Sequence, residues 1–136
     1  MAVTTANTQV KWNGGNNDYT LTSGSAISGD AHTFYGSSVM AMITLKADNT
    51  GTPASGDTVD FYLLYTTGDP DGSSVEEYDT VDHGMHIASL DTNKDDPARK
   101  TVEIPVSALG FKVYAKNNAS SNSIKVSSEV YETRVS

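Results

Sequence analysis

One stretch of the chain has histidines and a carboxylate close enough in sequence to suggest a zinc site. His83 and His86 are three residues apart, and Asp82 directly precedes the first. On an extended chain, residues three apart point to opposite faces, so these side chains would need a turn to converge on one ion. Ordinary loop histidines therefore explain this spacing better than a metal site.

Calcium chemistry is suggested by two loops rich in carboxylate and amide oxygens, the ligands that calcium prefers. These loops are Asp69-Pro70-Asp71-Gly72 and Asp91-Thr92-Asn93-Lys94-Asp95-Asp96. The second departs from the EF-hand pattern, because Asp96 stands where Gly is required and Val102 stands where Glu is required. Turn formation explains both runs. We therefore expect no cofactor, with loop-bound calcium as the alternative.

Catalysis would need a converging set of nucleophiles, acids or bases. Serine is abundant, but no Gly-x-Ser-x-Gly motif occurs. Glu76 and Glu77 are adjacent, and adjacent residues on a strand project to opposite sides, so they do not form the carboxylate pair of a glycosidase. We therefore predict that the protein is not an enzyme.

Aromatic side chains could form a sugar-binding face. The available ones are Trp12, Tyr19, Tyr35, Tyr62, Tyr65, Tyr78, Tyr114 and Tyr131. Carbohydrate-binding modules stack sugars on two or three exposed rings, but tyrosine is also common at sheet faces and protein interfaces. Both interpretations stay open.

The elements that would position these side chains are short strands. From residue 10 to residue 135 the chain alternates apolar and polar residues, and Gly, Asn, Asp, Ser or Thr closes each run. The clearest strand, residues 38–47, has two faces: Val39, Ala41, Ile43 and Leu45 against Met40, Met42, Thr44 and Lys46. About eight or nine such strands predict an all-β, two-sheet antiparallel β-sandwich. Long connections at 48–56 and 91–98 favour a jelly-roll over an Ig-like topology.

Length and charge limit the class of protein. The chain has 136 residues, no cysteine and a formal net charge of -8. Without cysteine, a disulfide framework and a zinc ribbon are excluded. The nine basic residues are scattered, which argues against a nucleic-acid partner.

The chain divides into a short polar start and one domain. Residues 1–8 are small and polar and predict a flexible N-terminal arm, followed by a single β-sandwich domain over residues 9–136. The start lacks a signal-peptide pattern, and no apolar run has the length of a membrane helix. We therefore expect synthesis in a cytoplasm without export and no membrane partner.

Strand and turn patterns between about residues 58 and 130 are similar to those of a known family. They are Phe61-Tyr62-Leu63-Leu64-Tyr65, Asp71-Gly72, Val102-Glu103-Ile104-Pro105-Val106, Gly110-Phe111-Lys112-Val113-Tyr114-Ala115-Lys116-Asn117-Asn118 and Ser123-Ile124-Lys125-Val126. This region resembles the small β-sandwich virion proteins of tailed bacteriophages, in particular the capsid decoration (cement) proteins.

The resemblance implies a structural virion protein, made in the host cytoplasm, that binds the capsid exterior and stabilises contacts between major capsid protein subunits. It also implies a homo-oligomer, either a dimer or a trimer. The candidate interface is an apolar patch of Met40, Met42, Tyr62 and Leu64, although the same side chains could belong to the intramolecular core. The alternative function is a carbohydrate- or receptor-binding β-sandwich module of a tail fibre or cell-surface protein.

Overall fold

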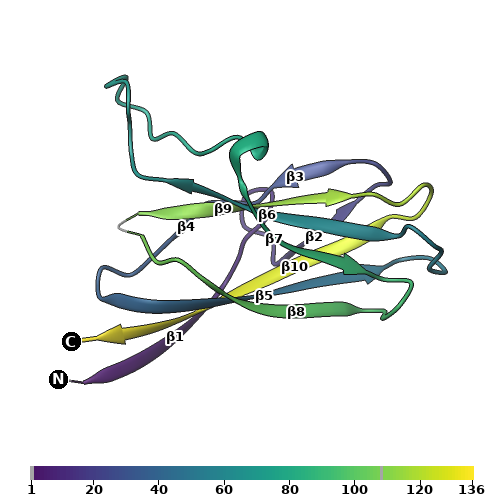
Figure 1. The fold of residues 1–136 in the computed structure, drawn as a ribbon, viewed down its shortest axis with the longest axis horizontal. Coiled ribbons are helices and arrows are strands. Elements are labelled where there is room, and N and C mark those ends of the chain that lie inside the picture. The colour runs from purple at the N-terminus through teal and green to yellow at the C-terminus, as the bar shows by residue number, and fades with distance from the viewer. Residues whose placement is uncertain (1, 108) are drawn as a thin grey trace.

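In a computed structural model, which describes residues 2–107 and 109–136, the chain forms two antiparallel sheets packed face to face (Figure 1). The first, here called the β10 sheet, has the order β1 (Val3–Gln9), β10 (Ile124–Val135), β5 (Ser38–Asn49), β8 (Ala98–Ile104), and β2 (Asp18–Leu21) also pairs with β10. The second, the β9 sheet, has the order β3 (Ala26–Ser28), β9 (Gly110–Asn117), β6 (Thr58–Thr66), β7 (Met85–Asp91), with β4 (His32–Thr33) also beside β9. A short 3₁₀ turn, η1 (Val81–His83), lies between β6 and β7.

The strand pairings are nested along the chain. The first strands, β1 and β2, pair with the last, β10; β3 and β4 pair with β9; β5 pairs with β8; and β6 pairs with β7. Rolling up one long antiparallel hairpin produces this order, which is the jelly-roll. The predicted all-β sandwich and its jelly-roll topology are confirmed. Among the described residues, ten strands occupy eight positions, because two outer positions are each shared by two strands.

The core lies between the sheets and is built from alternate residues of each strand. On β5, Ala41, Ile43 and Leu45 are buried while Met40 and Met42 point outward, so the two sets lie on opposite faces as the alternation predicted. Val39, predicted to share the face of the buried set, is 58% exposed and lies beside the register shift between β5 and β10. The largest fully buried side chains include Trp12, Phe61 and Phe111. Each such ring contributes about 1.5–3 kcal/mol of burial free energy.

The beginning of the chain differs from its predicted form. Residues 3–9, which the sequence assigned mostly to a flexible arm over residues 1–8, form β1 and pair with β10 from Val3–Val135 to Gln9–Glu129. Residue 1 lies outside the described residues. Figure 1 shows β1 and the end of β10 emerging together at one end of the sandwich, which we call the terminal end. The mobility of this strand stays a prediction.

No helix among the described residues has the length and apolar character needed to cross a bilayer.

Candidate protein-interaction surface

Four large apolar side chains are exposed on the outer face of the β10 sheet at its terminal end. They are Val3 (66% exposed), Met40 (45%), Met42 (37%) and Tyr131 (41%), and we call them the terminal patch. Tyr131 lies directly opposite Met42, and the outward position next to it on β10, Thr133, lies opposite Met40. Side chains in such cross-strand positions are near neighbours. The patch therefore spans three adjacent strands, β1, β10 and β5.

The inner face of the same strands holds one carboxylate among apolar core residues such as Ala41, Ile43 and Val130. Glu132, between outward-facing Tyr131 and Thr133, points between the sheets and is fully buried. Its Oε2 lies 3.1 Å from Nε2 of His32, and its Oε1 accepts hydrogen bonds from the Tyr35 N–H (3.0 Å) and the Ser38 hydroxyl (2.5 Å). At the terminal end, the β10 sheet thus has apolar side chains on its outer face and one hydrogen-bonded carboxyl group within its mostly apolar inner face.

Burial controls the ionisation of His32. Loss of solvent around the imidazole lowers the pKa of His32 below its usual 6.5, although the neighbouring Glu132 carboxyl opposes this shift. The pair also joins β4 to β10 across the two sheets. The sequence analysis missed both residues. The available signal was Glu132 itself, a charged residue at the core position of the alternating series that includes Val126 and Val130.

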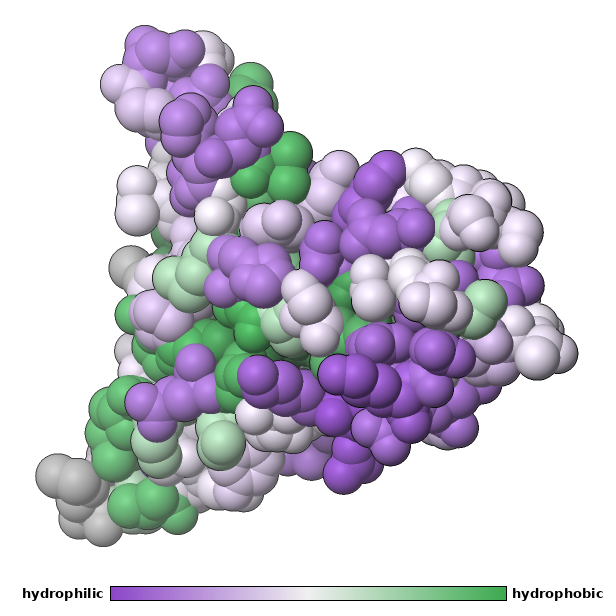
Figure 2. All heavy atoms as spheres, turned by 45° about the vertical axis from the view of Figure 1, so that its right-hand side comes forward, coloured by the Kyte–Doolittle hydropathy of each residue, from purple (hydrophilic) through white to green (hydrophobic). Residues whose placement is uncertain are grey.

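A polar row separates the terminal patch from the rest of this outer face. Asn7 Nδ2 donates to Glu129 Oε1 at 3.0 Å, and the hydroxyls of Thr44 and Thr101 are 2.8 Å apart. Figure 2 shows hydrophobic surface at the lower left, in the middle and near the top of the visible face, and mostly hydrophilic or intermediate surface toward its right-hand side. On the outer face of the β10 sheet, the exposed large apolar side chains Met40, Met42 and Tyr131 lie on the terminal side of this polar row.

Tyr62 and Leu64, the other two predicted interface residues, lie on the β9 sheet and face away from the β10 sheet. The four predicted residues therefore do not form one patch, because Met40 and Met42 lie on the opposite outer face. Leu64 is only 5% exposed. The segment between β6 and β7 (residues 67–84) covers it, and Gly84 approaches so closely that an added Cβ would lie 2.7 Å from Leu64 Cδ2. Leu64 belongs to intramolecular packing.

Two tyrosines with polar neighbours form a second surface, on the outer face of the β9 sheet, which we call the tyrosine face. The Tyr62 and Tyr114 rings have centroids 6.1 Å apart, and the His86 ring lies 5.1 Å from Tyr62. Asp60 accepts hydrogen bonds from Asn118 Nδ2 (3.0 Å) and from a serine hydroxyl of β7. Paired rings beside fixed polar groups are the arrangement that can stack and orient a sugar.

Three other aromatic candidates for sugar binding are buried or engaged in intramolecular contacts. Trp12 is fully buried. Tyr65 is half-buried and donates its hydroxyl to the Pro105 carbonyl at 2.6 Å, and burial raises its pKa above the usual value of 10. The ring of Tyr35 is exposed but lies under the guanidinium of Arg134, with 4.3 Å between the charge centre and the ring centroid.

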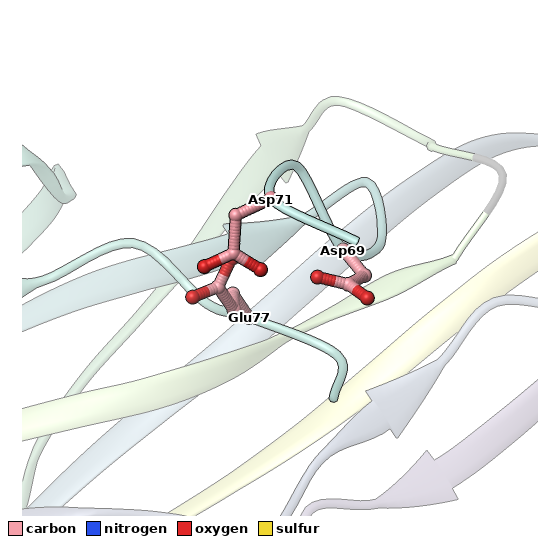
Figure 3. A group of neighbouring side chains, drawn as sticks. All are labelled: Asp69, Asp71 and Glu77. Carbon is pink, nitrogen blue, oxygen red and sulfur yellow. The ribbon is translucent and has the colours of Figure 1, made fainter. Parts of the chain in front are cut away.

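Three carboxylates gather on the β6–β7 segment (Figure 3). Asp69, Asp71 and Glu77 each place an oxygen within 4.8 Å of the others. Two of them belong to a predicted calcium loop, and Glu77 joins them because it bridges back to Gly68. Such an oxygen set suits a hard divalent cation. Within residues 2–107 and 109–136 this is the one group of three potential metal ligands, so the histidines at positions 83 and 86 do not join Asp82 in such a group.

The second predicted calcium loop uses its carboxylates to build turns. Asp91 Oδ1 accepts the Asn93 N–H at 2.9 Å, and Asp96 Oδ1 accepts the Asn49 N–H at 3.0 Å. These contacts agree with the turn interpretation of the acidic run at residues 91–96.

No protein-family model matches the chain, and no curated protein matches it. Similar solved structures include a variant of a family 29 carbohydrate-binding module (7% identity, TM-score 0.42, covering 96% of this chain and 92% of that one). They also include the capsid of Helicobacter pylori bacteriophage KHP30 (13% identity, TM-score 0.37, 95% and 93%) and infectious bursal disease virus (11% identity, TM-score 0.43, 97% and 32%). Viral capsid proteins and a carbohydrate-binding module are thus among the structural neighbours. Functional assignment depends on the surfaces of the chain itself.

Proposed function

We propose that the protein is a structural virion protein that binds the exterior of a phage capsid through the terminal patch and stabilises contacts between major capsid protein subunits. The observation that carries this proposal is the group of large apolar side chains that face solvent at the terminal end, which includes Met40, Met42 and Tyr131. An exposed apolar group rimmed by polar residues is typical of a protein-binding site.

The composition of the patch supports a protein partner. Methionine and tyrosine are enriched in the cores of interfaces, and a polar rim such as the Asn7–Glu129 pair surrounds such cores. Four side chains make a small contact, but repetition around a shell adds many modest contacts together. A cement function needs only this modest affinity for each copy.

The experiment is co-sedimentation of purified protein with undecorated phage heads. Met42→Glu places a charge in the patch, and we expect it to weaken head binding by at least about tenfold. Met85→Glu is the matched control, because Met85 is 41% exposed but lies on β7 of the other sheet. Equal binding by both variants, or equal loss, would contradict the assignment of the patch.

A second candidate function is carbohydrate binding on the tyrosine face, favoured by the paired rings of Tyr62 and Tyr114 and the polar groups around Asp60. Affinity electrophoresis in polysaccharide gels tests it. Tyr62→Ala should abolish retention, whereas Tyr131→Ala on the opposite face should leave retention unchanged. If the wild-type protein is not retained by host-surface polysaccharides, this second function is wrong.

A further inference from the structure

The free edge of β1 differs from the other edges of the sandwich. β8 carries three charged residues, β7 has a register irregularity against β6, and β2, β3 and β4 have only four, three and two residues. Charges, irregularities and shortness are the features that stop edge strands from pairing with other chains. β1 has none of them: its seven residues, Val3–Gln9, include no charge and no proline, and their register with β10 is unbroken.

The hydrogen-bond pattern shows which groups this edge offers. Val10 N–H bonds to the Ser128 carbonyl at 2.9 Å, and Ser136 N–H bonds to the Ala2 carbonyl at 3.0 Å. Bonding alternates along an antiparallel strand, so even-numbered residues of β1 bond to β10. The N–H and C=O groups of the odd-numbered residues, from Val3 to Gln9, therefore point away from the sheet. Among the described residues, no other strand pairs with this side of β1.

A groove of about 420 Å³ lies beside the end of β1, between the two sheets. Its lining consists of Thr8, Gln9, Val10, Lys11, Asp30, Ala31, His32, Thr33 and Tyr35. A strand added to β1 would direct every second side chain toward the interior side of the β10 sheet, where this groove opens. The groove therefore has room for side chains of the added strand.

We propose that β1 pairs antiparallel with β1 of a second copy of this chain about a two-fold axis, which joins the two β10 sheets into one. The net charge of -8 makes two copies repel each other, and an uncharged edge is where that repulsion opposes contact least. A strand edge that binds a basic partner would carry acidic residues, and β1 carries none. The inward-facing residues of β1 (Thr4, Ala6 and Thr8) are small enough for the groove.

One register pairs the complete strand. It places Ala6 of the two copies opposite each other, with Val3 opposite Gln9 and Thr5 opposite Asn7 of the second copy. Odd residues then face odd residues, so the outward-pointing N–H and C=O groups bond to each other. The two Ala6 residues form a pair without mutual hydrogen bonds, where Cα atoms approach to about 4.5 Å and small side chains fit best.

The first test is the mass of the protein in solution, measured by light scattering after size-exclusion chromatography. We expect twice the chain mass of 14.4 kDa. Thr5→Pro removes an N–H that faces away from β10 and should raise the dimer dissociation constant about 100-fold, since the two-fold axis doubles each lost bond. Thr5→Ala keeps the N–H and should remain dimeric. A monomeric wild-type protein, or an unchanged Thr5→Pro dimer, would overturn the proposal.

The second test does not depend on the folding of a proline variant. The chain has no cysteine, so Ala6→Cys introduces a single thiol, and a Cα separation of about 4.5 Å allows a disulfide between copies. Mild oxidation should cross-link Ala6→Cys but not Thr101→Cys on the β8 edge. Equal cross-linking at both sites, or none at residue 6, would overturn the pairing. A monomer that still binds phage heads would leave the proposed function standing and overturn only this inference.

Discussion

Leu64 on one outer face of the sandwich, and Met40 and Met42 on the other, occupy equivalent outward positions, but only Leu64 is covered. On the β9 sheet, the segment of residues 67–84 covers Leu64, which is 5% exposed. On the β10 sheet, Met40 and Met42 remain 45% and 37% exposed. Apolar residues on the first face are explained by the fold itself. Those on the second face call for a partner outside the chain.

The interiors behind the two faces differ as well. Behind the β9 sheet, Phe61, Leu63 and Val113 are fully buried. Behind the terminal end of the β10 sheet, Val130 is fully buried too, but the core there also includes the Glu132 carboxyl group with His32 as its neighbour. Specific polar contacts therefore add to apolar packing at this end.

The largest effect should come from removing the polar contacts beneath the terminal patch. Glu132→Ala leaves His32, the Ser38 hydroxyl and the Tyr35 N–H without their buried acceptor, at a cost of about 3–5 kcal/mol in the free energy of unfolding. Glu129→Ala, on the exposed face of the same strand, should change it by no more than about 0.5 kcal/mol. Urea denaturation measures both, and a small loss for Glu132→Ala would show that this end is held by other contacts.

The next largest effect should distinguish the covered position on one outer face from the uncovered position on the other. Leu64→Ala should lower the free energy of unfolding by about 2–4 kcal/mol, because a covered side chain leaves a cavity. Met42→Ala, at an uncovered position, should lower it by about 0.5 kcal/mol or less. The same denaturation measurement compares them. Similar losses for both variants would mean that the two faces are not covered differently in solution.

The alternation of residues 38–47 was sufficient to predict that Met40 and Met42 share one face and that Ala41, Ile43 and Leu45 share the other, because a strand has a fixed period of two. The same rule placed Tyr62 and Leu64 together on one face of their strand. It could not tell which sheet each strand joins, since pairing depends on residues far apart in sequence. Grouping all four in one patch was therefore wrong, although the choice of jelly-roll was correct.

Other features depend on contacts between segments far apart in the chain, which sequence patterns do not reveal. Residues 3–8 are small and, apart from Val3 and Ala6, polar, and they form a strand because β10 provides a ladder for them. Leu64 is covered because the segment carrying Gly84 folds back over it. Glu132 could have been found, because a carboxylate at a core position of β10 needs buried partners. Its actual partner, His32, is 100 residues away and could not be identified.

A smaller effect should come from changing Gly84, the residue that packs against Leu64 from the covering segment. Gly84→Ala adds a Cβ that would lie 2.7 Å from Leu64 Cδ2, so the segment or the leucine must shift, at about 1 kcal/mol. The φ angle of Gly84 is -72°, which any residue adopts, so the cost is steric. Gly36→Ala meets nothing within 4 Å and should be neutral. Thermal unfolding compares the two, and a neutral Gly84→Ala would show that the cover is loose.

The smallest effect is the pH dependence contributed by His32 behind the terminal patch. Burial holds the pKa of His32 below 6.5 in the folded protein, while the unfolded chain titrates near 6.5. Below pH 6.5 the unfolded chain therefore binds a proton that the folded protein does not. This contribution to stability is complete above pH 6.5 and is lost as the pH falls toward the folded-state pKa. The free energy of unfolding, measured from pH 8 down to pH 5, should decline more steeply for the wild-type protein than for His32→Gln. Equal slopes would mean that attraction to the Glu132 carboxyl stabilises the protonated imidazole as much as burial destabilises it. The pKa of His32 would then be the same in the folded and unfolded protein.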